Sequence, residues 1–397
     1  MRTQVAIIGA GPAGLTLAHL LHRSSIESVI VENRSREYVI ERVRAGVLEQ
    51  ATVDLMIAAG LGDRLQREGM RHDGVHIAFK GRRHRIDFAE LTGGGAIAIY
   101  GQNELVKDLI EARLQTGAPL FFESEDVTLT NLRDARPIVR FIHREHEYEV
   151  EADFVAGCDG SHGISRPAIP PTELRIYERT YPFAWLGILA EAAPSSHELV
   201  YSLHERGFAL FSMRSPQLTR LYLQCPPDED AEDWSDDRIW SELHARLRTD
   251  DGWTPTEGRI VQKAVTGMRS MVAEPMRWQR MFLAGDAAHI VPPTGAKGLN
   301  LAVADVARLA AAIETFYRDG SARSLEEYSP LALARVWRAQ RFSWWMTSTL
   351  HRAPDHSEFD YRRQVADLEY LVSSRAAMTS FAESYVGAPF DFYQRDC

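Results

Sequence analysis

Apolar runs that stop at glycine characterise the beginning of the chain. Residues 5–8 form a short run of this kind, which is typical of a strand buried inside a parallel sheet. From residue 12 to about 23 the apolar positions recur at helical spacing, and residues 29–31 form a second buried run. Residues 4–32 are therefore predicted to form one strand–helix–strand unit.

The rest of the chain alternates between strand-like and helix-like patterns. Residues 180–270 are rich in aromatic and β-branched runs separated by turns, whereas the C-terminal part repeats at helical spacing. The other expected elements are hairpins from about 74 to 99, a helix over 102–114, strands over 120–157, a buried strand over 281–284, and helices over 299–316, 330–349 and about 361–385. Because the run at 281–284 is like the N-terminal strands, the first domain is expected to be discontinuous.

These patterns predict an α/β protein with a nucleotide-binding domain, a β-rich insertion and a helical end. The first domain is expected over residues 1–175 and is completed by about 281–300. The β-rich substrate-binding domain is expected over 176–280, and a helical interface region over 291–397. A chain of 397 residues has room for two or three such domains.

Charge and cysteine content narrow the range of partners. The chain has 45 Lys and Arg against 55 Asp and Glu, a formal net charge of −10, so attraction of the whole molecule to nucleic acid or anionic lipid is not expected. Cys158, Cys225 and Cys397 stand at wide spacing, which excludes a disulfide scaffold and a cysteine-type zinc site and fits a reducing cytoplasm. No metal site is expected.

Three segments carry patterns that we interpret without a special function. The start of the chain resembles a signal peptide, but glycines and a proline interrupt its apolar stretch, and no window approaches the ~20 apolar residues of a membrane span. Residues 226–237, rich in acids and proline, could hold a metal, but we interpret them as a solvated loop that leads into a helix capped near Ser235. Residues 80–85 are interpreted as a basic, solvated hairpin.

A glycine-rich turn gives the first indication of chemistry. Gly9, Gly11 and Gly14 fit the spacing G-x-G-x-x-G between the first predicted strand and its helix. Such glycines let backbone N–H groups approach a pyrophosphate at the positive end of the helix. Glu32, at the end of the second strand, is placed to accept hydrogen bonds from the ribose hydroxyls of an adenosine. Together these residues predict a dinucleotide site.

Two further turns indicate which dinucleotide binds. Asp159 and Gly160 follow one buried strand, and Gly285 and Asp286 follow another. Either turn alone could be an ordinary strand end with an aspartate cap. The three motifs in this order resemble those of the flavoprotein aromatic hydroxylases, which have a glutathione-reductase-type Rossmann FAD-binding domain. The resemblance implies FAD as the cofactor, with Asp286 holding its ribityl chain.

Four other segments extend the resemblance over essentially the whole chain. Residues 42–50, 206–210, 288–300 and 341–348 look like those of the family members that hydroxylate 4-hydroxybenzoate at its 3-position. The resemblance implies an FAD-dependent monooxygenase that uses NADPH or NADH and O2, forms 3,4-dihydroxybenzoate in the catabolism of aromatic compounds, and is a homodimer. The W-x-W-x-I-P segment of the related halogenases is absent from the sequence.

The same resemblance implies how an aromatic acid would be held. A phenolate is a better nucleophile than a phenol toward the oxygen that the flavin carries, so the site must take up the phenolic proton. Tyr201 would contact the hydroxyl, and Tyr385 and then His72 would pass its proton to water. Arg214 would bind the carboxylate with two hydrogen bonds, which Lys cannot form. Alone, each of these residues would be an ordinary core or surface side chain.

Further roles are implied by the resemblance alone. Lys297 would add positive potential, the carbonyl of Pro293 would face the phenol, and Asn300 and Arg220 would control the flavin. The other implied residues are Ser212, Tyr222 and Thr294 for the substrate, and Arg42, Arg44, Ala45, Gly46, Val47, Gln102, Asp159 and Leu299 for FAD.

The nicotinamide coenzyme has no G-x-G-x-x-G unit of its own, so it would bind in a surface groove near His162 and Arg269. Arg34 and Tyr38 favour NADPH over NADH, since a 2′-phosphate pairs with cations. Arg36 also favours NADPH, whereas Asn33 and Glu41 supply no cation. Arg42 and Arg44 are further coenzyme candidates.

Two alternatives stay open. The substrate could be another para-substituted benzoate, such as 4-aminobenzoate or 3,4-dihydroxybenzoate. The chain could also be a flavin-bearing sensor that binds aromatic acids without turnover, although the presence of Tyr201, Tyr385 and Asn300 and the absence of a DNA-binding appendage favour an enzyme.

Overall fold

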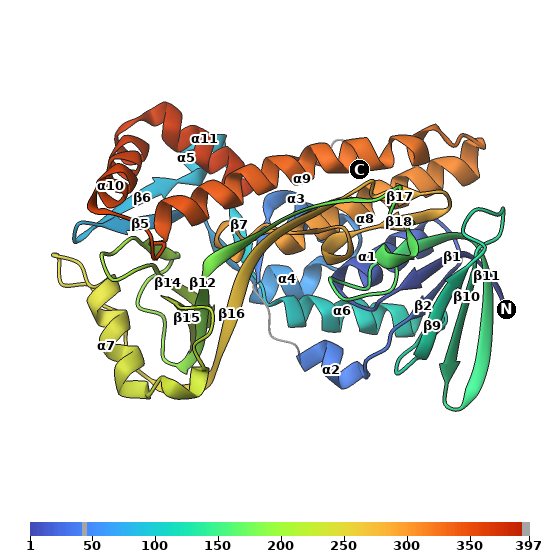
Figure 1. Cartoon of the computed structure of the whole chain (residues 1–397), viewed down its shortest axis with the longest axis horizontal. Coiled ribbons are helices and arrows are strands. Elements are labelled where there is room, and N and C mark those ends of the chain that lie inside the picture. Colours follow the sequence, from blue (N-terminus) through green and yellow to red (C-terminus); the bar gives the residue numbers. More distant parts are fainter. Residues whose placement is uncertain (42–45, 391–397) are drawn as a thin grey trace.

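The computed structural model describes residues 1–41 and 46–390. Arg42, Arg44 and Ala45 lie outside the described residues. The chain forms two eight-stranded sheets at opposite ends of the molecule, joined by two long strands, β12 (Arg175–Glu191) and β16 (Arg259–Glu274) (Figure 1). The long helix α9 (Arg323–Leu350) extends across the molecule, past both sheets.

The first sheet is mainly parallel and contains the predicted strand–helix–strand unit, with α1 (Pro12–Arg23) between its first two strands. The strand order is β17-β18-β11-β1-β2-β8, and β10 and β9 extend it from β11. The bounds are β1 Arg2–Ile8, β2 Ser28–Val31, β8 Leu120–Phe121, β9 Glu125–Thr130, β10 Ile138–His143, β11 His146–Gly157, β17 Arg277–Trp278 and β18 Met281–Leu283. Because β18 pairs in parallel with β11, the strand expected at 281–284 joins the N-terminal sheet.

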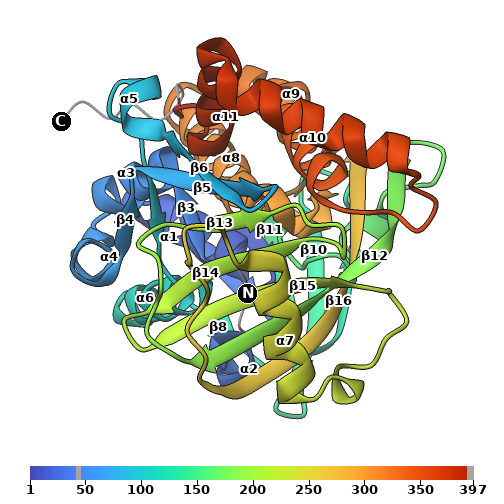
Figure 2. The same ribbon diagram turned by 90° about the vertical axis from the view of Figure 1, so that its left-hand side faces the viewer.

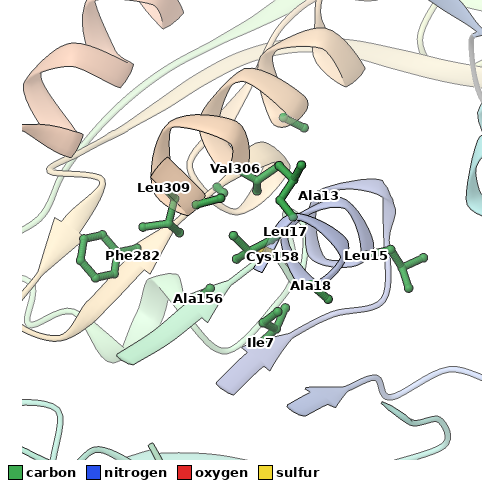
Figure 3. Packing of buried hydrophobic residues seen from close by; sticks show 14 of the residues in the cluster. Ile7, Ala13, Leu15, Leu17, Ala18, Ala156, Cys158, Phe282, Val306 and Leu309 are labelled. Carbon is green, nitrogen blue, oxygen red and sulfur yellow. The ribbon is translucent and has the colours of Figure 1, made fainter. Parts of the chain in front are cut away.

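Two helices pack on one face of this sheet. Figure 3 shows α1 and α8 (Gly298–Asp319) side by side above the strands, with Leu17 and Val306 among the side chains that fill the space between them. Ile7 and Phe282 are fully buried and point from the strands into the same core. Full burial of such side chains contributes about 1.5–3 kcal/mol each, so this core fixes the carboxyl ends of the strands where the glycine-rich turn stands.

The second sheet is mainly antiparallel and lies beneath α10 and α11 in Figure 2. Its order is β19-β16-β12-β15-β14-β13-β5-β6. The remaining bounds are β5 Gly74–Phe79, β6 Arg82–Asp87, β13 Val200–Ser202, β14 Ala209–Ser215, β15 Leu218–Cys225 and β19 His289–Ile290. A separate three-stranded sheet contains β3 (Val47–Glu49), β7 (Ile97–Ile99) and β4 (Met70–His72).

One hairpin lies in the second sheet although its sequence position is within the expected FAD-binding segment 1–175. The hairpin β5–β6 pairs through β5 with β13, so that Ile77 is opposite Tyr201. An alternating pattern indicates a hairpin but does not identify the sheet that its edge will join. The boundaries of the three domains stay a prediction.

The helices follow the sequence pattern with differences at their ends. Ser235 caps the helix after the acidic loop by accepting a hydrogen bond from the Arg238 N–H, as expected. Helix α9 starts before the expected residue 330 and contains Pro330, and the tail divides into two helices at Ser374. The other helices are α2 Arg36–Glu41, α3 Gln50–Ala58, α4 Gly62–Glu68, α5 Phe88–Thr92, α6 Gln102–Gln115, α7 Asp236–Leu247, α10 Glu358–Ser373 and α11 Arg375–Val386.

Within residues 1–41 and 46–390, the structure contains no helix with both the length and the apolar character that crossing a membrane requires.

Candidate active site

The glycine-rich turn has the shape that a pyrophosphate site needs. A Cβ atom at Gly9 would lie 2.4 Å from the carbonyl oxygen of Cys158, and one at Gly14 would lie 2.0 Å from the carbonyl oxygen of Gly9. Gly9 also has a positive φ of 104°, which favours glycine. Gly11, by contrast, is the N-cap of α1, and a Cβ there would meet nothing within 4 Å. Gly9 and Gly14 are thus required by packing, while Gly11 faces open space at the positive end of the helix.

Glu32 is held in place at the end of β2. Its side chain is buried, one carboxylate oxygen accepts from the Ala10 N–H (2.7 Å), and the other accepts from the Arg34 N–H (2.8 Å). A carboxylate oxygen has more than one acceptor position, so Glu32 can still accept from ribose hydroxyls while it stabilises the turn beside it.

The two aspartate turns stand at the carboxyl ends of β11 and β18. One oxygen of Asp159 accepts from the backbone and hydroxyl of Ser165 (both 2.9 Å), and its other oxygen is buried without a partner among the described residues. Burial raises the pKa of Asp159, although the hydrogen bonds from Ser165 oppose that shift. Asp286 is exposed within the short 3-10 helix Gly285–Ala287. An orphaned acceptor and an exposed carboxylate around the open glycine turn fit the hydroxyl-rich chain of FAD.

A buried ion pair supports the Asp286 turn from behind. The Nε2 atom of His289 lies 2.6 Å from the carboxylate of Asp305, which also accepts from the Gly285 N–H (2.9 Å). Burial opposes the charge of His289, but the adjacent Asp305 raises its pKa. Neither residue was expected from the sequence.

Strand register brings the expected substrate residues onto one face of the second sheet. Tyr201 on β13 is opposite Leu210, which is opposite Tyr222 on β15, and Ser212 is opposite Arg220. Opposed residues share a face, as do residues two apart along a strand. Tyr201, Ser212, Tyr222 and Arg220 therefore point to the same side.

Two arginines on this face lack an acidic partner. Arg214 is half-buried, and its guanidinium donates to the side-chain oxygen of Asn103 (3.0 Å) but forms no ion pair among the described residues. Burial lowers the pKa of Arg214, and the charge of the nearby Arg220 adds to that shift. Arg220 stacks on the ring of Tyr222 at 5.2 Å, and its Nη1 atom is buried without a partner within the same residues. An anion would stabilise half-buried cations of this kind.

Arg214 also connects this face to the segments expected at the flavin. A Cβ atom at Gly46 would lie 2.8 Å from its Nη1 atom, and one at Gly101, which precedes Gln102 at the start of α6, would lie 3.2 Å from its Nη2 atom. Arg214, which the resemblance assigns to the substrate carboxylate, and the implied FAD segments are therefore neighbours. Val47 follows in β3.

The two expected relay tyrosines are in direct contact. Their hydroxyl oxygens lie 2.5 Å apart, and both side chains are almost completely buried. Tyr201 comes from β13 and Tyr385 from α11. Burial, with the charge of Tyr385 as a smaller cause, holds the pKa of Tyr201 well above its ordinary value. Burial likewise raises the pKa of Tyr385. Both hydroxyls are therefore protonated at neutral pH and can transfer a proton along the pair.

His72 does not continue this contact directly. It is buried at the end of β4, and neither ring nitrogen has a hydrogen-bond partner among the described residues. Burial lowers the pKa of His72 to about 4. A proton that moves from Tyr385 to His72 therefore needs a bridging water, as buried polar groups commonly have.

Lys297 has a partner that the sequence reasoning missed. Its ammonium group lies 2.6 Å from Glu49 and donates to the carbonyl of Tyr385 (2.8 Å). Burial lowers the pKa of Lys297, and Glu49 opposes that shift. Glu49 lies in the segment 42–50, which carried the resemblance. An acid next to a buried strand was the sequence signal that could have indicated it. The positive potential expected from Lys297 is thus partly neutralised.

Asn300 joins the helical region to β3. Its oxygen accepts from the Glu49 N–H and the Thr52 hydroxyl, and its amide donates to the carbonyls of Val47 and Ala296. All four hydrogen-bonding positions are used within the protein. The expected control of the flavin by Asn300 stays a prediction.

The loop before α8 packs against α9. Thr294 is fully buried and accepts a hydrogen bond from the hydroxyl of Thr347 (2.9 Å), and a Cβ at Gly295 would meet the hydroxyl of Ser343. Pro293, at the start of this loop, is exposed, and Leu299 is half-buried at the start of α8.

The expected coenzyme residues lie on three separate segments. Arg34 stacks on the ring of Tyr38 at 5.2 Å next to α2, and both are exposed. His162 is exposed in the turn after β11, and Arg269 on β16 lies 3.4 Å from Glu178.

Comparison with known proteins agrees with this geometry. Residues 2–343 match the family described as FAD binding domain. A p-hydroxybenzoate hydroxylase of Acinetobacter baylyi is 48% identical over 396 residues, which cover 100% of this chain and 98% of that protein. A 3-(3-hydroxy-phenyl)propionate/3-hydroxycinnamic acid hydroxylase of Mycobacterium sp. (strain JLS) is 27% identical over 77% of this chain, which spans about half (53%) of that longer protein.

Solved structures share the fold. The p-nitrophenol 4-monooxygenase PnpA of Pseudomonas putida superposes with a TM-score of 0.81 at 19% identity, covering 97% of this chain and 99% of that one. Aklavinone-11 hydroxylase, solved with FAD and aklavinone, gives a TM-score of 0.73 at 22% identity over 90% of this chain and 70% of that one. The chain belongs to the FAD-binding-domain family, and within it to the FAD-dependent aromatic monooxygenases related to p-hydroxybenzoate hydroxylase.

Proposed function

We propose that the chain hydroxylates 4-hydroxybenzoate at its 3-position to 3,4-dihydroxybenzoate, with NAD(P)H and O2 as co-substrates. The observation that carries this proposal is one sheet face with a cationic side and a phenolic side. Arg214 and Arg220 lack an acidic partner among the described residues, while Tyr201 presents a buried hydroxyl bonded to Tyr385. A benzoate with a para hydroxyl matches both sides. The 48% identity to a p-hydroxybenzoate hydroxylase supports the same substrate.

The protein groups have distinct tasks in this reaction. FAD, when bound at the glycine turn near Glu32 and Asp286, would supply the electrons taken from the coenzyme and the activated oxygen. Arg214 would bind the substrate carboxylate and compensate its own buried charge. The Tyr201 hydroxyl would accept the phenolic proton in exchange for its own, which passes to Tyr385, so the ring becomes an electron-rich phenolate. A free phenol of pKa about 10 is otherwise hardly ionised at neutral pH.

The assignment of Arg214 to the substrate carboxylate is tested with Arg214→Lys. Lys keeps the charge but loses the two-pronged hydrogen bonding, so 4-hydroxybenzoate should bind more weakly, by about 1.5–3 kcal/mol for a charged hydrogen bond. Flavin fluorescence titration would measure the affinity, and Arg206→Lys, an exposed arginine of the same domain, is the control. Unchanged affinity in Arg214→Lys would mean that the carboxylate binds elsewhere.

The second candidate substrate is a related para-substituted benzoate. 4-Aminobenzoate and 3,4-dihydroxybenzoate would satisfy the arginines equally well, but an amine offers no acidic proton to the tyrosine pair. Product analysis with each acid, NADPH and O2 separates them. A yellow protein that binds these acids and forms no hydroxylated product would instead support the sensor alternative.

We also infer a homodimer in the cytoplasm. Trp344 on α9 and Phe359 and Tyr370 on α10 are large apolar side chains that remain exposed, and such surfaces favour a second copy of the chain. The free thiols Cys158 and Cys225 are compatible with a reducing compartment. Light scattering after size exclusion measures the assembly.

A further inference from the structure

A solvent-open cavity of about 610 Å³ lies on the side of the second sheet that faces away from Tyr201. It is lined by residues of the β5–β6 hairpin, which adjoins β13 in Figure 2, and by the segment 195–198 that leads into β13. His76 is opposite Val200, whereas its neighbour Ile77 is opposite Tyr201, so His76 and Tyr201 point to opposite faces. The cavity is therefore separate from the sheet face with Tyr201, Tyr222 and Arg220.

His76 and Glu198 form the polar centre of this cavity. The Nε2 atom of His76 lies 3.7 Å from the Glu198 carboxylate, which Arg85 binds with two hydrogen bonds of 2.8 Å each. The Nδ1 atom of His76 is buried without a partner among the described residues. Arg83 also faces His76, and Arg71, Asp73 and His197 complete the charged lining. One nitrogen of His76 thus faces the interior and the other faces the cavity.

His72 lies immediately behind the cavity wall. Its chain neighbours Arg71 and Asp73 both line the cavity, and the charges of Glu198, Asp73 and His197 act on its imidazole. On the inner side, the N–H of Phe88 donates to the carbonyl of Asp73 (2.6 Å), and the Phe88 ring stacks on Tyr385 with centroids 5.0 Å apart. The segment 71–73, which contains His72, therefore connects the cavity wall to Phe88, which packs on Tyr385.

We propose that this cavity is the port through which the phenolic proton reaches solvent, with His76, held by Glu198, accepting the proton that leaves His72. The proposal rests on the proposed function, which requires the phenol to ionise. One proton leaves the substrate hydroxyl and passes through Tyr201 to Tyr385. Bridging water carries it to His72 and then to His76, from which it enters bulk water, so no oxidant or reductant is consumed. Burial lowers the pKa of both histidines. They are therefore neutral at pH 7 and free to accept a proton, and neither retains it.

The proposal is tested by following proton release directly. FAD-loaded enzyme is mixed rapidly with 4-hydroxybenzoate in weak buffer at pH 8, and a pH-indicator dye reports the proton that reaches solvent. His76→Asn should slow this release by about tenfold or more, since positioned proton transfer contributes roughly 10²–10⁴-fold and water retains part of the path. Glu198→Gln, which keeps the side-chain shape, should also slow it. Added imidazole should restore the rate in His76→Asn, because a small base can enter an open cavity.

The matched control is His84→Asn. His84 lies on the same hairpin but is opposite Ile77, and its ring stacks on Phe79 at 4.9 Å, away from the cavity. Proton release in this variant should equal that of the wild type. Wild-type rates in both His76→Asn and Glu198→Gln would overturn the port, and so would a slowed release that imidazole does not restore, because it would indicate a structural role. If the wild type itself releases no proton with 4-hydroxybenzoate, the proposed function has failed, which distinguishes the two outcomes.

Discussion

Three cations near the candidate site, the buried Lys297 and the half-buried Arg214 and Arg220, differ in whether they have an acidic partner. Lys297 is paired with Glu49, whose other carboxylate oxygen lies 3.7 Å from Arg335, so one acid serves two cations. Arg214 and Arg220 have no acidic partner among the described residues, although even partial burial of a charge costs free energy. The two cations without any acidic partner therefore lie on the sheet face with Ser212 and Tyr222, which is where the carboxylate of an aromatic acid would supply the missing acid.

Loss of the Tyr201 hydroxyl should separate coenzyme oxidation from hydroxylation of the substrate. Tyr201→Phe removes the proton acceptor at nearly constant volume, so folding and FAD binding should survive, while the bound substrate stays a neutral phenol. Coenzyme oxidation should continue, but most of the oxygen should appear as hydrogen peroxide instead of hydroxylated product. The measurement is peroxide and product formed per coenzyme consumed.

A second tyrosine supplies the control for this prediction. Tyr181 is also buried, but its hydroxyl contacts Ser270 (3.2 Å) and not the tyrosine pair. Tyr181→Phe should remain coupled. If Tyr201→Phe formed one product per coenzyme at the wild-type rate, the assigned relay would be wrong.

At the scale of elements, the turn between β1 and α1 shows that glycines in one motif have different roles. Gly11→Val should fold, because its φ of −73° is open to any residue and its Cβ meets nothing within 4 Å. The branched side chain would occupy the space that a pyrophosphate needs, so the variant should lose FAD. Gly14→Ala should instead destabilise the fold, because its Cβ would lie 2.0 Å from a backbone oxygen. Flavin absorbance and thermal unfolding of both variants measure these effects; a Gly11→Val protein with full flavin content would contradict the assignment.

The junction of α9 with β12 should make stability depend on pH. His351, at the end of α9, accepts from the Trp185 indole (2.7 Å) and contacts the carbonyl of Thr347, and burial lowers its pKa to about 3. The unfolded chain has a histidine pKa near 6.5. Its contribution is therefore present above about pH 6.5 and is lost as pH falls toward 3, by about 2 kcal/mol at pH 5.

Urea unfolding of the holoenzyme at pH 8 and pH 5 measures this contribution. His351→Gln should be less stable than the wild type at pH 8 and should lose less stability on acidification. The exposed His146→Gln is the control for removing a histidine. Equal pH dependence of His351→Gln and wild type would contradict the prediction.

The sequence predicted those elements whose signals are local. The bounds of α1, the cap of α7 by Ser235 and the strand at 281–284 each followed from residues next to one another. The start of α9 was missed because proline is favoured only in the first turn of a helix, so Pro330 indicates a beginning, whereas it lies inside α9. The sheet that the β5–β6 hairpin joins depends on β13, which is far away in sequence.

At the scale of the whole molecule, the candidate site joins segments that no local pattern connects. Tyr201 and Tyr385 are 184 residues apart, and Lys297 and Glu49 are 248 apart. Only the resemblance to a family indicated that the tyrosines belong together, and it did not indicate Glu49, Asp305 or the cavity around His76. The long strands β12 and β16 and the helix α9 hold the two large sheets together (Figure 1), and Arg214 of the second sheet lies beside Gly46 and Gly101, which precede β3 of the three-stranded sheet and α6.

Coenzyme choice also involves the whole molecule, because its expected residues come from three distant segments. Arg34 and Arg36 are exposed beside α2 and form no ion pair within residues 1–41 and 46–390, so they are available to a 2′-phosphate. NADPH should therefore have a lower KM than NADH. Arg34→Gln should raise the KM for NADPH about tenfold, the equivalent of one charged hydrogen bond, and leave that for NADH nearly unchanged. Steady-state oxidation of each coenzyme with 4-hydroxybenzoate measures this, with the exposed Arg248→Gln after α7 as control. An equal or lower KM for NADH in the wild type would show that these arginines do not select the phosphate.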